Sequence, residues 1–468
     1  MSITDNRETV RQIEEKVTAA SPIRLGVNKK NELVRLVYEI CRSKNITYDE
    51  AMELAGVDSI IKKGKNGFFH GLKQALLDIR YPSSGSADDP HIMPLKISDG
   101  SRECEQWGRS LRPKNIYVEE SARDLPWTNS FLKNFPEAKV EVAPDLRALT
   151  AGEKGGDPVD VYGRRGENLF VVKRGHTFIK ECPCTKSARR CGYWILNIGF
   201  GCPIDCSYCY LQQYSNVSGM VFPANVEDYY GAIEEFDRKV KGLTRIGTGE
   251  FTDSLALDKY TEYSAMLIPF FGDMKNLILE LKTKVSEVDN VLGCEPNENV
   301  VVSWSMNTRF IADEYEKGGA SIDERLSAAL AIARRGYNIG FHFDPIVYYE
   351  GWEEEYRSIV EEIFSHEEIC KKTAWISLGT LRYTPGLKQV AEQRFSDNRI
   401  FYCGEFFSDV DEKMRYQREL RVEMYNKMTG WIRSFTKECW IYLCMEPEDV
   451  WKSTDIKEED RSFRWYPG

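Results

Sequence analysis

Three cysteines stand close together in the chain, at Cys202, Cys206 and Cys209, in a Cys-x3-Cys-x2-Cys spacing with Tyr208 directly before the last of them. Three thiolates alone do not complete a tetrahedral structural zinc site. They can hold three irons of a four-iron cluster and leave the fourth iron open to a second molecule. The spacing therefore indicates an iron–sulfur enzyme, with a zinc site completed by a distant ligand as the alternative.

The elements around these cysteines indicate where they lie in a fold. An apolar strand over residues 194–199 leads into the cysteine loop, and apolar strands then alternate with amphipathic helices. The predicted strands cover residues 194–198, 244–247, 277–281, 300–305, 339–343 and 375–378, and the predicted helices include 322–335 and 352–364. Buried strands covered by helices are typical of parallel α/β sheets, and six such units predict a partial (β/α)6 barrel. Active residues are then expected at the carboxyl ends of the strands, where the cysteine loop begins.

Length and composition exclude several classes of protein. The chain has 468 residues and a formal net charge of −10, which argues against broad nonspecific binding of nucleic acid but leaves room for a local basic groove. No apolar run of about 18 residues predicts a membrane span, and residues 1–9 do not resemble a signal peptide. Thirteen cysteines in so long a chain fit reduced, metal-binding thiols better than a disulfide scaffold, which predicts a cytoplasmic protein.

The chain divides into four predicted regions. Residues 1–80 have helical apolar spacing and predict an N-terminal helical region, and residues 81–112 are a linker that begins with a run rich in Pro, Ser and Gly. Residues 113–191 predict a small α/β domain with strands over 115–118, 139–142 and 168–172. Residues 192–468 predict the partial barrel with a C-terminal extension.

Four groups of residues resemble the spore photoproduct lyase family of the radical S-adenosylmethionine (SAM) superfamily. The matching segments are residues 201–212 (GCPIDCSYCYLQ), 249–258 (GEFTDSLALD), 302–307 (VSWSMN), and 344–346 (DPI) with 350–352 (EGW). The resemblance implies a four-iron four-sulfur cluster, reductive cleavage of SAM, and hydrogen abstraction from substrate by a 5′-deoxyadenosyl radical. DNA-repairing members of the family split a methylene-bridged thymine dimer.

The resemblance also implies roles for individual residues. Cys202, Cys206 and Cys209 are expected to ligate the cluster. The expected SAM contacts are Tyr208 near the adenine, Gly247, Gly249 and Glu250 at the amino group, Lys284 at the carboxylate, and Ser305 and Asn307 at the ribose or carboxylate. A carboxylate such as Glu250 suits an ammonium group through a charge-assisted hydrogen bond.

One position departs from the family pattern. DNA-repairing members carry a cysteine that returns a hydrogen atom to the product radical, and this chain has Glu250 there. Tyr208 and Tyr210 match the tyrosines that assist this thiol, so both are expected to take part in catalysis. Because a carboxylate cannot replace a thiol as hydrogen donor, another donor such as Cys403 is required.

A second cysteine group, Cys182, Cys184 and Cys191, precedes the first barrel strand with a Cys-x-Cys-x6-Cys spacing. It could bind an auxiliary iron–sulfur cluster with a fourth ligand from elsewhere, and nearby basic residues would favour thiolates. The alternative is that these are buried cysteines that pack as small apolar side chains. The basic residues could instead hold an anionic substrate.

Three hypotheses for the function follow. The leading one is a radical SAM enzyme that repairs or modifies a nucleic-acid base. The second is radical SAM modification of a peptide or small metabolite, aided by the auxiliary cluster. The third is a non-catalytic iron–sulfur or zinc protein. Either enzyme needs an electron donor such as flavodoxin or ferredoxin, and no membrane partner is expected. The oligomeric state cannot be inferred from the sequence.

Overall fold

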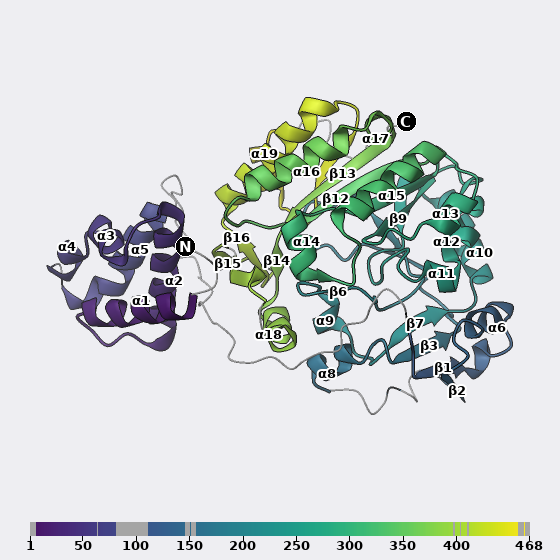
Figure 1. Cartoon of the computed structure of the whole chain (residues 1–468), viewed down its shortest axis with the longest axis horizontal. Helices are drawn as coiled ribbons and strands as arrows, with labels where there is room; N and C mark the ends of the chain where they lie inside the picture. The colour runs from purple at the N-terminus through teal and green to yellow at the C-terminus, as the bar shows by residue number, and fades with distance from the viewer. Residues whose placement is uncertain are drawn as a thin grey trace. The chain divides into compact units, whose positions relative to one another are not determined.

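The computed structural model describes residues 6–62, 64–80, 111–145, 150, 156–395, 398–402, 404–409, 411–456 and 463. The chain forms two compact units (Figure 1). One comprises residues 1–100 with 399–421, and the other comprises 101–398 with 422–468. The linker predicted over 81–112 lies outside the described residues, apart from its last two positions.

The N-terminal unit is built on five α-helices. They are α1 (Asn6–Ala20), α2 (Val27–Lys44), α3 (Tyr48–Leu54), α4 (Val57–Lys62) and α5 (Phe68–Arg80), joined by η2 (Lys65–Gly67), η5 (Ile400–Tyr402) and the hairpin β15 (Phe406–Ser408)–β16 (Met414–Tyr416). Leu33, Leu36 and Leu72 are fully buried in its core. Because helices bury one apolar stripe, α2 and α5 must pack against neighbours to be stable.

The larger unit contains a small sheet of four parallel strands in the order β2-β1-β3-β7. The strands are β1 (Asn115–Glu119), β2 (Lys139–Ala143), β3 (Asn168–Val172) and β7 (Met220–Pro223), with η3 (Glu120–Ala122), α6 (Pro126–Leu132) and α8 (Pro158–Gly163) between the first three. The three predicted strands are present. The fourth, β7, follows the cysteine loop, so this sheet draws on residues from both sides of that loop.

The main sheet has eight strands in the order β17-β13-β12-β10-β9-β8-β5-β4 and curls into a half-barrel (Figure 1). Its strands are β4 (Ile179–Glu181), β5 (Trp194–Leu196), β8 (Thr244–Gly247), β9 (Leu277–Thr283), β10 (Val300–Ser305), β12 (Asn338–Ile346), β13 (Thr373–Thr380) and β17 (Trp440–Leu443). All are parallel except β4, which pairs antiparallel with β5 at one edge. The predicted partial barrel is confirmed, and β17 adds a seventh parallel strand to the six that were predicted.

Helices cover the outer face of this sheet (Figure 1). The helices of this region are α10 (Glu227–Lys239), α11 (Asp258–Thr261), α12 (Tyr263–Phe271), α13 (Asp289–Gly293), α14 (Arg309–Tyr315), α15 (Ile322–Arg335), α16 (Trp352–Phe364), α17 (Glu367–Lys372), α18 (Pro385–Arg394), α19 (Arg418–Phe435) and α20 (Glu448–Ser453), with α9 (Leu211–Tyr214) after the cysteine loop. Among them, α18 packs against α8 and α9 rather than on the outer face of the sheet (Figure 1). The two helices predicted over 322–335 and 352–364 have these bounds. Ser321 begins α15 as a capping box with Glu324, a pairing that satisfies otherwise unpaired amide groups. No helix among the described residues is long and apolar enough to cross a membrane.

The two edges of the half-barrel are linked by the loop between β4 and β5, residues 182–193, which we call the bridging loop. Ala188 in this loop forms an antiparallel bridge with Pro447, which follows β17 at the opposite edge. The amide of Arg189 also donates to the carbonyl oxygen of Glu446 at 2.9 Å. The bridging loop therefore closes the gap that the partial barrel leaves open, and it carries the second cysteine group.

Gly340 lies in β12, where three strands pack closely. A Cβ atom there would lie 2.6 Å from Ser303 Oγ and 2.7 Å from Trp375 Nε1. We therefore expect Gly340→Ala to lower the free energy of unfolding by about 1–3 kcal/mol through overpacking, measured by urea denaturation. Gly231→Ala is the matched control, because Gly231 lies inside α10 with nothing within 4 Å of an added Cβ. Gly231→Ala should raise the free energy of unfolding by up to about 1 kcal/mol. Equal changes in the free energy of unfolding for the two variants would contradict the packing argument.

Candidate active site

A buried carboxylate anchors the cysteine loop. Asp205 stands inside the loop, and its Oδ1 lies 3.0 Å from Arg165 Nη2 while its Oδ2 lies 2.8 Å from Arg394 Nη2. The three side chains are almost wholly excluded from solvent. A buried charge must be paired to be tolerated, so this triad ties the loop to α18 and to the segment after α8.

The same side chains hold the loop's backbone. Arg165 Nε donates to the carbonyl oxygen of Cys202 at 2.9 Å. Gln212 Nε2 donates to the carbonyl oxygens of Cys206 at 3.2 Å and Ser207 at 3.0 Å, while its Oε1 accepts from Arg394 Nη1 at 2.6 Å. We call Arg165, Asp205, Gln212 and Arg394 the anchor cluster. It satisfies carbonyl groups that a loop of this shape would otherwise leave unpaired.

The three thiols belong to the loop that follows β5. Burial raises the pKa of Cys202, Cys206 and Cys209, and each thiol is near at least one other. Arg165 favours the thiolates of Cys202 and Cys209, and Lys284 favours that of Cys206. In a four-iron cluster each of three thiolates binds a different iron, so the three need not converge on one point.

The residues expected to contact SAM come from the carboxyl ends of neighbouring parallel strands. Gly247 ends β8 and is followed by Gly249 and Glu250, Lys284 follows β9, and Ser305 ends β10. Gly247 has no space for a side chain, because a Cβ there would lie 1.7 Å from the Tyr193 hydroxyl. The parallel register places these strand ends along one edge of the sheet, as the barrel predicts.

Lys284 and Tyr208 meet at a buried glutamate. Residues 316–317 form β11 (Glu316–Lys317), which pairs antiparallel with β6 (Asp205–Cys206) in the cysteine loop. Lys284 Nζ lies 3.0 Å from Glu316 Oε1, Arg325 Nη2 lies 2.7 Å from Glu316 Oε2, and the Tyr208 hydroxyl donates to Glu316 Oε1. Burial alone would raise the pKa of Glu316, but Lys284 and Arg325 outweigh it and lower the pKa to about 2.

Ser305 and Asn307 lie at the end of β10, and both are buried. Asn307 Nδ2 donates to the Pro345 carbonyl oxygen at 3.1 Å, and its Oδ1 accepts from the amide of Thr308 at 3.1 Å. The carbonyl oxygen of Ser305 accepts from Arg325 Nη1 at 2.9 Å. These bonds link the ends of β10 and β12 and fix the rim of the site, while direct contact of either residue with SAM stays a prediction.

Tyr210 faces Glu250 at the position where the family pattern departs. The Tyr210 hydroxyl donates to the Glu250 carbonyl oxygen and lies 3.2 Å from Glu250 Oε1. Burial raises the pKa of Tyr210 well above its ordinary value, and the Glu250 charge adds to this effect, so the phenol keeps its proton. Tyr210, the expected catalytic tyrosine, is therefore in contact with Glu250, the residue expected at the position of the family's donor thiol.

The second cysteine group does not form a matching cluster site. Cys182 Sγ and Cys184 Sγ lie 3.6 Å apart, a contact between sulfurs that differs from thiolates on separate irons. The hydrogen bond between the two thiols raises the pKa of Cys182 and lowers that of Cys184 to about 7, and Glu250 disfavours both thiolates. Cys191 lies deeper, near Arg245. The structure does not support an auxiliary cluster here.

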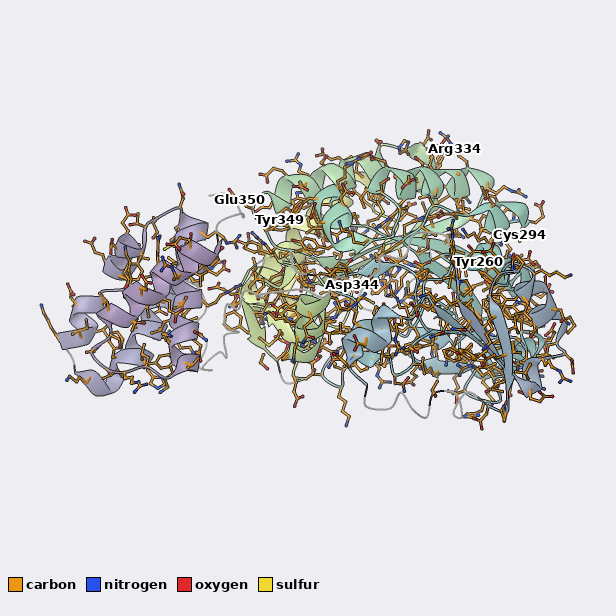
Figure 2. The ribbon with its side chains drawn as sticks, turned by 60° about the horizontal axis from the view of Figure 1, so that its bottom comes forward. Tyr260, Cys294, Arg334, Asp344, Tyr349 and Glu350 are labelled. Atoms are coloured by element: carbon orange, nitrogen blue, oxygen red, sulfur yellow. The ribbon has the colours of Figure 1, made fainter. Side chains whose placement is uncertain are left out.

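Further charged groups line the interior of the half-barrel. Asp344, at the end of β12, pairs with Arg382 through Oδ1–Nη1 at 2.9 Å and Oδ2–Nη2 at 3.2 Å. His342 Nε2 lies 2.7 Å from Glu280 Oε1. Figure 2 shows Asp344 among interior side chains, in contrast to Arg334 on the outer surface of the helical layer. The His342–Glu280 pair is buried and gives the histidine a structural partner.

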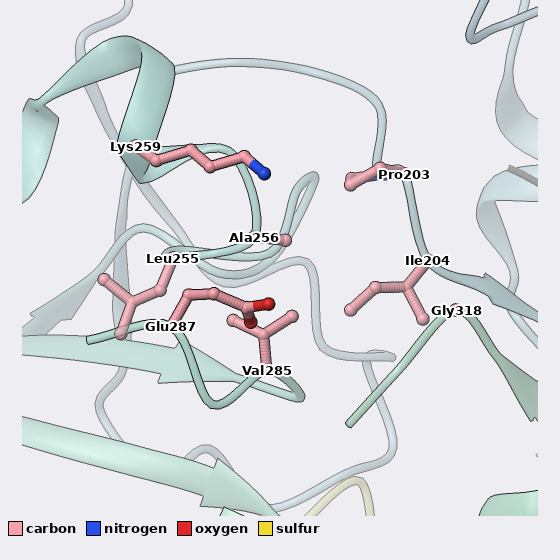
Figure 3. Close-up of a pocket in the computed structure, with 8 residues that line it drawn as sticks. All are labelled: Pro203, Ile204, Leu255, Ala256, Lys259, Val285, Glu287 and Gly318. Atoms are coloured by element: carbon pink, nitrogen blue, oxygen red, sulfur yellow. The ribbon is translucent and has the colours of Figure 1, made fainter. Parts of the chain in front are cut away.

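A small pocket borders the cysteine loop (Figure 3). It is lined by Pro203, Ile204, Leu255, Ala256, Lys259, Val285, Glu287 and Gly318. The side chain of Lys259 extends toward Pro203 (Figure 3). The lining includes two residues of the cysteine loop but none of the residues expected to contact SAM.

Sequence reasoning missed the buried acids that hold the site together. Asp205 and Glu316 could not be recognised from the sequence because their cationic partners lie on other elements of the fold, Arg165 and Arg394 for Asp205, and Lys284 and Arg325 for Glu316. Asp253 accepts hydrogen bonds from the amides of Leu255 at 3.0 Å and Lys284 at 2.8 Å, so it ties the loop after β8 to the end of β9. Its place in the segment GEFTDSLALD was the available signal. Cys403, named as a possible hydrogen donor, lies outside the described residues.

Comparison with known proteins shows the family. The profile of the spore photoproduct lyase family matches residues 111–421. The chain belongs to the spore photoproduct lyase family. It is 26% identical over 308 residues to spore photoproduct lyase of a Geobacillus species, covering 65% of this chain and 86% of that protein. It is 24% identical over 312 residues to the Bacillus subtilis enzyme, with coverage of 65% and 86%.

Solved structures of spore photoproduct lyase share the fold. One variant of that enzyme matches with a TM-score of 0.61 at 24% identity, covering 72% of this chain and all of that one. Another, with bound AdoMet and dinucleoside spore photoproduct, matches with a TM-score of 0.61 and covers 71% and 99% of the two chains. The family consists of radical SAM enzymes, so the predicted enzyme class is confirmed.

Asp205→Asn tests the anchor cluster in this family member. The change leaves Arg165 and Arg394 as buried cations without a carboxylate. We expect the free energy of unfolding to fall by about 3–5 kcal/mol, measured by urea denaturation of the anaerobic protein. Glu137→Gln, at an exposed position, is the control and should change stability by less than about 0.5 kcal/mol. A small effect of Asp205→Asn would show that the anchor cluster contributes little.

Glu316 gives a pH prediction with a defined sign. Its pKa is about 2 in the folded protein against an ordinary value of 4.5. Its stabilising contribution is therefore fully present above about pH 5 and is lost as the pH falls through the folded pKa. The free energy of unfolding of wild type should exceed that of Glu316→Gln by roughly 3 kcal/mol near neutral pH. Denaturant unfolding at decreasing pH should show this difference shrinking below about pH 4.5. A difference that stays constant down to about pH 3 would contradict the proposed pairing.

Proposed function

We propose that this protein is a radical SAM lyase that repairs or modifies a thymine lesion of the spore photoproduct type in DNA. The observation that carries the proposal is the position of Cys202, Cys206 and Cys209 after the carboxyl end of the first parallel strand. In the same loop Tyr208 is bonded to Glu316 and Tyr210 to Glu250. The family match over residues 111–421 supports the same reaction class.

The cofactors fit the residues that are present. Cys202, Cys206 and Cys209 would hold a four-iron four-sulfur cluster, and Glu250, Lys284 and Ser305 would contact SAM. When bound and reduced, this pair of cofactors supplies a 5′-deoxyadenosyl radical. The protein's own part is to fix the thiols through the anchor cluster and to keep water from the reacting atoms. Charged residues fixed before the reaction cost no reorganisation when it occurs.

Each polar contact at the site has a definite task in this proposal. Lys284 Nζ lies 3.0 Å from Glu316 Oε1, and this ion pair holds the ammonium group in place to bind the carboxylate of SAM. The Tyr208 hydroxyl donates to the same carboxylate, which fixes the tyrosine side chain within the cysteine loop. The electron enters from a small redox protein such as flavodoxin or ferredoxin, the usual one-electron donors for such clusters.

The substrate class rests on the relatives. One related enzyme was solved with bound dinucleoside spore photoproduct. Glu250 is the observation that favours a second candidate, the modification of a peptide or small metabolite, because the family's hydrogen donor is missing at this position. We place the nucleic-acid reaction first because the rest of the site matches the family and the auxiliary cluster of the second candidate lacks support.

A direct assay separates the two candidates. The anaerobically reconstituted enzyme, with SAM and a chemical reductant, is incubated with dinucleoside spore photoproduct, and thymine dinucleoside is measured by mass spectrometry. We expect substrate loss matched by repaired product, and no reaction with Cys209→Ala, which removes one predicted cluster ligand. Formation of 5′-deoxyadenosine without any loss of the photoproduct would contradict the proposed substrate and favour the second candidate.

A further inference from the structure

The paired thiols of the bridging loop lie beside the cysteine loop. Cys182 directly follows β4, and its amide donates to the Tyr193 carbonyl oxygen at 3.1 Å, which holds it at the base of the loop. Two residues before it, Lys180 Nζ lies 3.9 Å from the ring centroid of Phe251. The Phe251 carbonyl oxygen accepts from the Gly201 amide at 2.9 Å. A short chain of contacts thus connects β4, the Glu250–Phe251 segment and the cysteine loop.

Cys182 also shares the surroundings of Tyr210 and Glu250. The Tyr210 hydroxyl donates to the Glu250 carbonyl oxygen, and the ring of the next residue, Phe251, lies against Lys180, two residues before Cys182. The Glu250 carboxylate in turn acts on both Cys182 and Cys184. Since the Tyr210 hydroxyl lies 3.2 Å from Glu250 Oε1, these groups form one contiguous set.

Several other thiols of the larger unit are engaged elsewhere. Cys294 Sγ lies 3.3 Å from the Asn290 carbonyl oxygen, and Cys370 Sγ lies 3.2 Å from that of Phe364. Cys439 Sγ lies 3.7 Å from Arg433 Nη1, at the start of β17, which is the end opposite the active edge. Cys444 lies at the active edge, directly after β17, but its Sγ accepts from Arg382 Nη2 at 3.5 Å, within the Asp344–Arg382 pair. Among the described thiols, Cys182 is the one that follows β4 beside the Glu250–Phe251 segment.

We propose that Cys182, in contact with Cys184, is the hydrogen-atom donor of this enzyme and replaces the thiol that Glu250 displaces. The inference rests on the proposed function, because it concerns how a substrate-derived carbon radical is quenched. Cys182 thus supplies, from the bridging loop, the donor thiol that the family pattern places after β8. Glu250 then keeps Tyr210 in place rather than reacting.

The step balances as a single hydrogen-atom transfer. The S–H bond of Cys182 breaks, a C–H bond forms on the product radical, and a thiyl radical remains on Cys182. Cys184, whose sulfur lies 3.6 Å away, can share the unpaired electron with it. One electron from the flavodoxin- or ferredoxin-type donor and one proton from water then restore the thiol.

Isotope incorporation tests the assignment. Thiol hydrogens exchange with solvent, so turnover of dinucleoside spore photoproduct in D2O should place deuterium in the repaired thymine of wild type. Cys182→Ser should keep 5′-deoxyadenosine formation but lower the yield of deuterated repaired product by at least about tenfold. Cys294→Ser, at a thiol bonded to Asn290 away from the site, is the matched control and should behave as wild type.

The formation of 5′-deoxyadenosine guards against loss of folding, because it requires the folded protein with its cluster and SAM but not the donor thiol. Unchanged product yield and deuterium content in Cys182→Ser would overturn the inference while leaving the proposed function intact. Loss in Cys184→Ser but not in Cys182→Ser would overturn the assignment to Cys182. Wild type that forms 5′-deoxyadenosine without repairing the photoproduct would refute the proposed function itself, and the inference with it.

Discussion

The paired charges around Asp205 are the constraint on which the site depends. The cysteine loop has no regular secondary structure over most of its length, so its backbone carbonyl and amide groups need hydrogen-bond partners from elsewhere. Apolar packing alone cannot supply them. The carboxylate of Asp205 lies within 3.0 Å of Arg165 and 2.8 Å of Arg394, and the same guanidinium groups or their partner Gln212 bind the loop's carbonyl oxygens. Removing Asp205 would leave two buried guanidinium groups without a carboxylate, which is a strong reason for the loop to hold one conformation. The thiols are therefore positioned before a cluster is assembled.

The second requirement is that strands distant in sequence have their carboxyl ends at the same edge of the sheet. Seven parallel strands bring the cysteine loop, the Gly247–Glu250 segment, Lys284 and Ser305 to one edge of the sheet because their carboxyl ends coincide. The half-barrel would leave its two edge strands apart, and the bridging loop joins them through Ala188 and Pro447. This closure has a chemical consequence, since it carries Cys182 to the neighbourhood of Tyr210 and Glu250. Under the proposal above, Cys182 is then the donor thiol of this site.

The apolar runs of the sequence predicted the six barrel strands and two helices well, because a buried parallel strand requires a continuous apolar segment. Pairing partners were harder to predict. The strand β7 joins the small sheet although the cysteine loop separates it from β3 in sequence. The cluster cysteines were evident from their spacing. Asp205 and Glu316 were not, because their ion-pair partners lie on other elements and leave no local pattern. Arg394 is 189 residues from Asp205, and Lys284 is 32 residues from Glu316. The proximity of Cys182 to Tyr210 likewise depends on how the bridging loop crosses the open side of the barrel.

Iron content and electron paramagnetic resonance of the anaerobically reconstituted protein test the central claim most directly. Wild type is compared with the triple variant Cys202→Ala, Cys206→Ala and Cys209→Ala. The account predicts about four irons per chain in wild type, a cluster signal that changes when SAM is added, and neither iron nor signal in the triple variant. About four irons retained in the triple variant, with a signal indifferent to SAM, would contradict the account, because a cluster would then reside at the bridging-loop cysteines instead.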